Sequence, residues 1–243
     1  MNQLPSKLER PPLLEAVFEI RFTSAQEGGG ELLPGLLFAA FRDVFSKVEP
    51  TNVGIIPREM RQQHPALRYA GQYKLQGKNE ALLLGDNVLS LIVTPPYPGW
   101  SRFRARCLEV ATALKKTELV ASVDRYSLKY VNLLPNPRSL SAFKIRVDLG
   151  GREMTENGFI LRFETLGDGF LSIVECASAQ TVANDLIRKS GMLFSIDTIC
   201  DRGLGEFWTD VQGRVDSAHR VLEELFFGLL APDTLEGLGP IWE

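Results

Sequence analysis

The sequence predicts an α+β fold: a mainly antiparallel sheet, strongly curved or in two leaves, with two shorter helices and a long C-terminal helix packed on it. Several short segments alternate apolar with polar residues, which is typical of half-buried strands. Three longer segments repeat apolar residues at spacings of three and four, which is typical of amphipathic helices. The connections between successive strands are short, and this favours antiparallel pairing.

The first half of the chain begins with a strand over 14–22, whose inward face carries Leu14, Ala16, Phe18, Ile20 and Phe22. Residues 28–30, three glycines, predict a flexible connection to a helix over 32–48. Strands follow over 67–76, 80–85 and 88–94. After a proline-rich break, a helix over 100–118 presents an inner stripe of Trp100, Phe103, Cys107, Val110, Ala111 and Leu114.

The second half predicts strands over 123–134, 143–149, 159–166, 170–176 and 192–200. A closing helix over 207–230 is stopped by Ala231-Pro232, and residues 231–243 form a C-terminal tail. We find no repeat and no Gly/Ser-rich linker, so residues 1–243 are expected to form a single α+β domain. The stretch 135–141 is the one candidate for an internal boundary.

The chain has 243 residues, 44% of them hydrophobic and 23% charged, which excludes a disordered or collagen-like protein. No apolar run approaches the length of a membrane span, and the first residues show no secretory signal. We therefore expect a cytoplasmic protein that does not contact a membrane. Three separated cysteines in such a chain indicate reduced, buried thiols rather than a zinc or redox pair.

Groups that catalyse reactions are scarce in this sequence. The only histidines are His64, in a polar loop, and His219, on the closing helix. Neither has a neighbouring motif that indicates a nucleophile, so we expect no catalytic residue, no metal and no cofactor. One alternative is a convergence of Glu164, Glu175 and Asp197 on adjacent strands, although pairing with Arg162 is the simpler arrangement.

A basic cluster stands out around the second helix. Arginines occupy three positions in its first two turns, where the helix dipole disfavours cations, and the next strand adds two more basic residues. The candidate anion-binding set is Arg102, Arg104, Arg106, Arg125 and Lys129. Either these charges pair with carboxylates such as Glu15 and Glu19, or they bind the phosphates of a nucleotide or of single-stranded nucleic acid. Lys144 and Arg146 would lie on the polar face of the following strand.

The closing helix and the tail offer a candidate interface. Apolar residues run along the helix with heptad-like spacing, which fits a helix docked on a sheet, a dimer seam or a groove for a partner. An apolar Trp close to the chain end would dock on its own domain or on a partner. The candidate partner or dimer interface is Trp208, Val211, Val215, Leu222 and Trp242.

Three stretches of the first 135 residues form a recurrent pattern: PPLLEAVFEIRF at 11–22, YPGW at 97–100 before a helix, and DRYSLKYVN at 124–132. The pattern resembles a sporadically distributed prokaryotic family of about this length. The third stretch is similar to that family's Arg-Tyr-x-Leu-Arg-Tyr-x-Asn strand, with Lys129 where Arg is usual. The resemblance implies no established activity or cofactor. Its patchy distribution implies mobile genes, such as those of toxin–antitoxin or anti-phage loci.

The sequence therefore predicts a non-enzymatic binding protein: a regulatory or accessory subunit that recognises a protein partner or associates with itself. The charge distribution supports this prediction, because the first 120 residues have a basic excess and the rest an acidic excess. The alternative is a sensor that binds phosphate groups through the cluster from Arg102 to Lys129.

Overall fold

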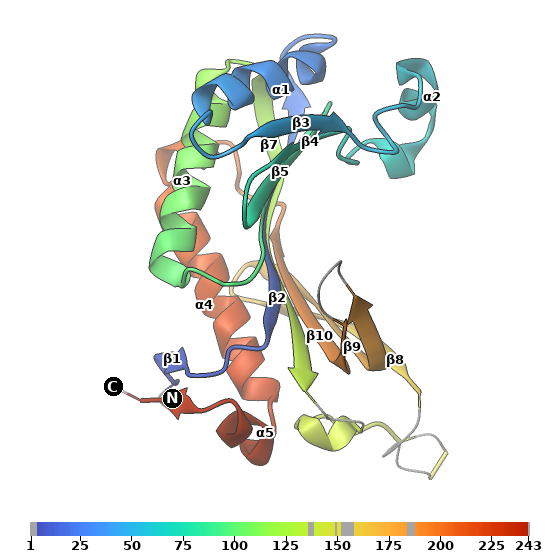
Figure 1. The fold of residues 1–243 in the computed structure, drawn as a ribbon, viewed down its shortest axis with the longest axis vertical. Helices are drawn as coiled ribbons and strands as arrows, with labels where there is room; N and C mark the ends of the chain where they lie inside the picture. Colours follow the sequence, from blue (N-terminus) through green and yellow to red (C-terminus); the bar gives the residue numbers. More distant parts are fainter. Residues whose placement is uncertain (1–3, 136–138, 149, 152–157, 184–187, 243) are drawn as a thin grey trace. The chain divides into compact units, whose positions relative to one another are not determined.

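The computed structural model describes residues 4–135, 139–148, 150–151, 158–183 and 188–242. The strands in this part of the chain are β1 Lys7–Leu8, β2 Leu13–Ser24, β3 Lys47–Pro50, β4 Tyr73–Gln76, β5 Glu80–Gly85, β6 Val88–Val93, β7 Val120–Pro135, β8 Ile160–Gly167, β9 Phe170–Ala183, β10 Arg188–Cys200 and β11 Pro240–Ile241. The helices are α1 Gly29–Ala40, α2 Arg58–Gln63, α3 Trp100–Lys116, α4 Val211–Leu229 and α5 Pro232–Gly237 (Figure 1). Three single 3-10 turns, η1 Pro65–Leu67, η2 Leu140–Ala142 and η3 Phe207–Thr209, complete the order.

Nine of the described strands form one open antiparallel sheet in the order β3-β4-β5-β6-β2-β7-β10-β9-β8. The ribbon of β1 and β11 is separate from it. The predicted α+β class, the antiparallel pairing and the long C-terminal helix are confirmed. Short loops between consecutive strands, such as the one joining β5 and β6, leave room for no other pairing.

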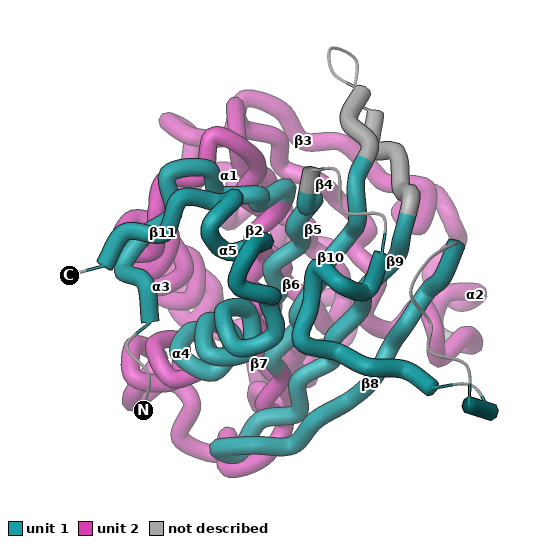
Figure 2. Tube along the Cα trace, turned by 90° about the horizontal axis from the view of Figure 1, so that it is seen from below, with its two compact units in different colours: residues 1–14, 129–198, 219–243 teal, residues 15–128, 199–218 magenta. Residues whose placement is uncertain are grey.

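The chain divides into two compact units (Figure 2). Unit 1 holds residues 1–14, 129–198 and 219–243, and unit 2 holds residues 15–128 and 199–218. Each change of unit falls inside β2, β7, β10 or α4, so neither unit is a continuous segment.

The core of unit 2 lies between β2, β4, β5 and β6 and the helices α1 and α3. The inward residues predicted for β2 behave as expected, because Ala16, Phe18, Ile20 and Phe22 are fully buried. Helix α1 packs against β4 and β5, and α3 packs against β6. The predicted inner stripe of α3 is confirmed at five positions, which are Phe103, Cys107, Val110, Ala111 and Leu114.

In unit 1, the second half of α4 packs on β10. The ring of Phe226 stacks on that of Phe194, with centroids 5.6 Å apart. Phe143 contacts Phe194 at 4.8 Å, and an isolated bridge joins Phe143 to Leu230. These contacts place Phe226 of α4 against the sheet, and docking on a sheet is one of the three arrangements that the spacing of the helix allows.

Several predicted elements differ from the structure. The helix predicted over 32–48 begins earlier and ends at Ala40, because Lys47–Pro50 pairs with β4 as an edge strand. The glycines at its start are not a loose connection, since Gly29 and Gly30 are buried in the first turn of α1. Only Tyr73–Gln76 of the strand predicted over 67–76 is extended, and α2 and η1 replace the polar loop before it.

The strand predicted over 143–149 is absent from the described residues of that stretch, which follow η2 and form only isolated bridges, such as the one between Phe143 and Leu230. Leu149 lies outside the described residues. The predicted tail contains helix α5 and strand β11, and the latter pairs with β1. A search of the described helices finds none long and apolar enough to cross a membrane.

Candidate functional site: an arginine-lined cavity

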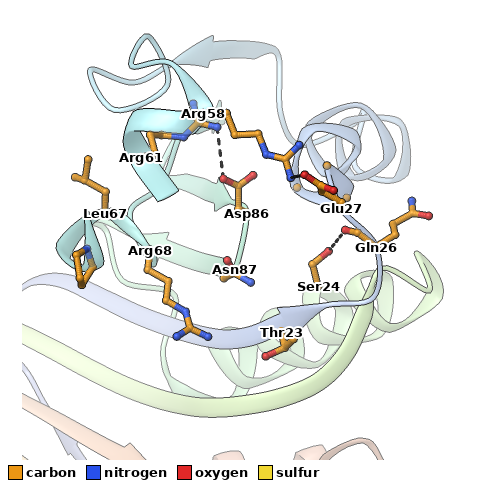
Figure 3. Close-up of a pocket in the computed structure, with 14 residues that line it drawn as sticks. Thr23, Ser24, Gln26, Glu27, Arg58, Arg61, Leu67, Arg68, Asp86 and Asn87 are labelled. Carbon is orange, nitrogen blue, oxygen red and sulfur yellow. Dashed lines mark hydrogen bonds and ion pairs between the residues drawn. The ribbon is translucent and has the colours of Figure 1, made fainter. Parts of the chain in front are cut away.

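A cavity of about 520 Å³ opens in unit 2 beside the N-terminus of α1. Its wall combines the end of β2, the first turn of α1, helix α2, the segment 65–68 and the β5–β6 turn. The lining residues are Thr23, Ser24, Gln26, Glu27, Gly28, Gly29, Gly30, Arg58, Arg61, Pro65, Leu67, Arg68, Asp86 and Asn87 (Figure 3). We call it the arginine cavity, because its three arginines outnumber its two acids.

Glycines allow α1 to begin directly at the cavity wall. Gly28 precedes the helix with a φ of 76°, a left-handed conformation that favours glycine. A Cβ on Gly30 would lie 2.4 Å from the Cα of Asp86, so no other residue fits between α1 and the β5–β6 turn. No side chain caps the helix, but the amides of Gly29 and Glu31 already donate to the carbonyls of Gln26 and Gly28, at 3.2 and 3.0 Å. Gly28, Gly29 and Gly30 line the cavity, so the positive end of the helix dipole borders it.

Arg61 is the most buried charged group of the wall, with 8% of its side chain exposed. Its Nη1 donates to the carbonyl of Ile56 at 2.6 Å, and its Nη2 lies 3.4 Å from Oδ2 of Asp86. Gln72 donates to the same Oδ2 at 2.8 Å, which fixes the carboxylate. The Nε of Arg61 and the Oδ1 of Asp86 are both buried and have no hydrogen-bond partner among the described residues.

Arg58 and Arg68 are held less tightly. Arg58 lies 3.7 Å from the carboxylate of Glu27, which is 85% exposed, and the buried Nε of Arg58 has no partner among the described residues. The guanidinium of Arg68 is exposed, 5.1 Å from the ring centre of Tyr69. In Figure 3, Arg58, Arg61 and Arg68 approach from the side of α2, while Ser24, Gln26 and Glu27 approach from the start of α1.

Most of the basic cluster predicted from the sequence pairs with carboxylates. Arg104 contacts Asp216 at 3.2 Å, and Arg125 lies 3.7 Å from Glu19. Arg106 contacts Glu80 through Nε at 2.8 Å and through Nη2 at 3.0 Å, and it also contacts Glu109 at 2.7 Å. Burial alone would lower the pKa of Arg106, but the hydrogen bonds to Glu80 and Glu109 outweigh it and raise that pKa. The predicted pairing of Glu19 with this cluster is therefore confirmed at Arg125.

Arg102 is exposed and has no ion pair with the described residues. It lines a second cavity of about 620 Å³, in which Lys78, Arg102 and Arg106 are balanced by Asp43, Glu80 and Glu109. Lys129 is a half-buried residue of β7 in unit 1, whereas the four arginines belong to unit 2. Lys144 and Arg146 lie where the predicted strand is missing.

The predicted interface residues differ in exposure. Val215 and Leu222 are 0% and 1% exposed, so the chain itself covers them. Trp208 and Val211 are half-buried, and Trp242 is 52% exposed. A partner could touch Trp242 without any rearrangement of the chain, and the interface stays a prediction.

None of the remaining candidate groups is a lining residue of the arginine cavity. His64 is exposed at the end of α2, and His219 contacts the ring of Tyr130 with centroids 6.0 Å apart. All three cysteines are buried, and burial raises the pKa of Cys176 to about 12. Arg162 pairs with Glu164 at 2.8 Å, as the simpler arrangement of the carboxylates predicted. No group of three or more His, Cys, Asp or Glu that could hold a metal occurs in the described part.

Sequence reasoning missed Arg58, Arg61 and Arg68, because the segment was interpreted as a solvated loop around His64. Two signals were present in the sequence: three arginines within eleven residues, and a strand followed by glycines and a helix. The second signal places backbone amides at a helix start, but it lacks the spacing of a dinucleotide motif. Nothing in the sequence indicates that the arginines at 58–68 and the glycines at 28–30 line the same cavity.

Comparison of the sequence with protein-family models and with curated proteins finds no match. The resemblance of residues 11–22, 97–100 and 124–132 to a sporadic prokaryotic family therefore stays a prediction.

Proposed function

We propose that this protein is a non-enzymatic binding protein that holds a phosphorylated small molecule in the arginine cavity. One observation carries the proposal: Arg58, Arg61 and Arg68 line the same cavity as the uncapped N-terminus of α1. Guanidinium groups bind phosphate oxygens through paired N–H donors, and a helix N-terminus adds the positive end of its dipole. The combination favours an anion with several oxygen acceptors.

The size and polarity of the cavity restrict the ligand class. A volume of about 520 Å³ lies in the range of sites for small molecules. Thr23, Ser24, Gln26 and Asn87 supply neutral polar groups beside the arginines, which suits the sugar or base of a phosphorylated metabolite or nucleotide. Arginine keeps its proton at neutral pH, so the three guanidinium groups serve to bind and orient rather than to exchange protons.

The proposal keeps the ligand class of the sequence-based alternative but changes the site. The cluster from Arg102 to Lys129 is less suitable, because Arg104 and Arg106 contact carboxylates at 3.2 and 2.8 Å. In the arginine cavity, Arg58 and Arg61 lie farther from their carboxylates, at 3.7 and 3.4 Å. The arginine cavity also has one more positive than negative side chain, and its Arg68 is exposed and has no ion pair with the described residues. Recognition of a protein encoded nearby, in a mobile defence locus, remains a separate proposal from the sequence.

Calorimetric titration with phosphate, pyrophosphate and ATP at low ionic strength tests the proposal, since salt screens exposed charges. We expect pyrophosphate and ATP to bind more tightly than phosphate. Arg68→Ala and Arg58→Ala should each weaken binding by about tenfold or more, because a hydrogen bond to a charged group contributes about 1.5–3 kcal/mol. Arg61→Ala is less informative, because Arg61 also holds the carbonyl of Ile56.

Arg102→Ala is the matched control, because it removes an exposed arginine from a different cavity of unit 2. We expect it to bind pyrophosphate like the unmodified protein. If Arg102→Ala lost pyrophosphate binding and Arg68→Ala kept it, the anion site would lie in the cluster from Arg102 to Lys129 instead. No heat and no thermal stabilisation with any of the three anions would refute phosphate binding altogether.

A further inference from the structure

Strand β8 is a long edge of the sheet, and no other described strand pairs with its outer side. It lies last in the strand order and pairs with β9 alone among the described strands. Its eight residues, Ile160–Gly167, contain no proline and no lysine, which are the residues that commonly protect edges. The opposite edge, β3, has four residues, of which the first is Lys47 and the last is Pro50. The two edges therefore differ in how readily they accept another strand.

The register with β9 shows which backbone groups of β8 point outward. The amide of Ser178 donates to the carbonyl of Phe159 at 3.0 Å, one pair beyond Ile160↔Ala177. At the other end, a two-residue turn with positive φ at Asp168 and Gly169 joins Gly167 to Phe170. Antiparallel hydrogen bonding alternates along a strand, so the odd-numbered residues bond to β9. The amides and carbonyls of residues 160, 162, 164 and 166 then point away from it.

The side chains of these four residues are also accessible. Ile160 and Leu166 are 74% and 81% exposed, and both are apolar. Between them, Arg162 and Glu164 form an ion pair at 2.8 Å with about half of each side chain exposed. Along the strand, the four exposed side chains are therefore apolar, basic, acidic and apolar. In an antiparallel copy the order is apolar, acidic, basic and apolar, so each charge can face one of opposite sign.

We propose that β8 pairs with β8 of a second copy of this chain, antiparallel and centred on Phe163. This register places Arg162 opposite Glu164 of the second copy and Ile160 opposite Leu166 of the second copy. Centring the pair on Arg162 would oppose two arginines, and centring it on Glu164 would oppose two glutamates. Opposite charges across strands stabilise a pair and like charges destabilise it, so the sequence selects the register on Phe163. The same pairing satisfies the outward amides and carbonyls of both copies.

Sedimentation velocity over a range of concentrations tests the pairing. The unmodified protein should show a reversible monomer–dimer equilibrium. Arg162→Glu puts two acidic residues on each copy, and Glu164→Arg puts two basic residues there. Each variant alone should weaken dimerisation by at least tenfold, because every cross-strand charge pair becomes repulsive.

Mixing the two variants separates pairing from misfolding. In the mixed dimer each acidic residue faces a basic one, so an equimolar mixture should dimerise like the unmodified protein. The double variant, with both charges exchanged, should also dimerise. Lys47→Glu is the matched control, since Lys47 pairs with Glu49 on the opposite edge strand, and it should leave the equilibrium unchanged.

Two results would overturn the proposal. One is an unmodified protein that stays monomeric up to about 1 mM, the weak limit of specific association. The other is a dimer that neither single variant weakens, which would place the contact on another surface. The pairing does not depend on the arginine cavity, and anion titration of the monomeric variants keeps the two proposals distinguishable.

Discussion

Gly30 is the residue that most directly determines the shape of the arginine cavity. Its missing side chain lets the first turn of α1 approach the backbone of Asp86, and Asp86 in turn pairs with Arg61. A single backbone contact thus places a helix N-terminus, a carboxylate and a buried guanidinium together. In the sequence, three consecutive glycines indicate only flexibility, because the neighbour that requires Gly30 lies 56 positions away, at Asp86.

Replacement of Gly30 should therefore destabilise the protein. Gly30→Ala places a Cβ 2.4 Å from the Cα of Asp86, and the backbone must shift. We expect the free energy of unfolding to fall by about 1–3 kcal/mol, as for other overpacked sites. Gly35→Ala in the same helix meets nothing within 4 Å and should stabilise the protein by up to about 1 kcal/mol. Urea denaturation of both variants measures the difference, and equal stabilities would contradict this role of Gly30.

At the scale of elements, the ion pairs of α3 explain the excess of arginine in its first turns. Arg106 spans from α3 to Glu80 at the start of β5, and its guanidinium lies 5.0 Å from the ring centre of Phe41, just after α1. The side chains of Arg106 and Glu80 are only 16% and 24% exposed. A half-buried, bidentate pair between two elements holds the helix to the sheet, so the unusual charge at this helix start has a structural cause.

The Arg106–Glu80 pair should contribute to stability, whereas Arg102 should not. Arg106→Ala leaves Glu80 without its partner in a mostly buried position, and we expect a loss of about 1–3 kcal/mol. A double-mutant cycle with Glu80→Ala should show a coupling of similar size, because the two groups touch. Arg102→Ala should change the unfolding free energy by less than about 0.5 kcal/mol. A coupling free energy near zero would show that the Arg106–Glu80 pair does not stabilise the contact between α3 and the sheet.

The spacing of apolar residues predicted correctly which faces of α3 and β2 are buried. It failed where the structure of a segment depends on pairing with a strand far along the chain. The stripe of α3 and the inward face of β2 follow from spacing alone, and both are confirmed. The residues after Ala40 keep helical spacing, yet Lys47–Pro50 forms an edge strand, because β4 offers unpaired backbone groups. The arginine cavity has the same cause of failure: its wall joins residues near 25, 60 and 86 through contacts such as Phe22 with Asn87.

At the scale of the whole molecule, the chain runs repeatedly through both units. Strands β2, β7 and β10 and helix α4 each contribute residues to unit 1 and to unit 2. An element that loses its structure in one unit cannot keep its hydrogen bonds unchanged in the other. The expectation of a single domain, drawn from the absence of a Gly/Ser-rich linker, stays a prediction.

We therefore expect one cooperative unfolding transition. Trp100 and Trp208 belong to unit 2 and Trp242 to unit 1, so tryptophan fluorescence reports on both. Guanidinium titrations followed by fluorescence and by far-ultraviolet circular dichroism should give coincident midpoints. Two separated midpoints would show that the units unfold independently, contrary to the continuity of the four shared elements.

The unequal edges of the sheet also limit how large an assembly can grow. When two copies join through β8, each copy retains only the short β3 strand at its periphery, with Pro50 unable to donate a hydrogen bond. A third copy would have no long unpaired edge strand to pair with, so strand addition stops at the dimer and does not continue into a fibre. Pro50 on the β3 edge thus limits an assembly formed through the β8 edge to two copies.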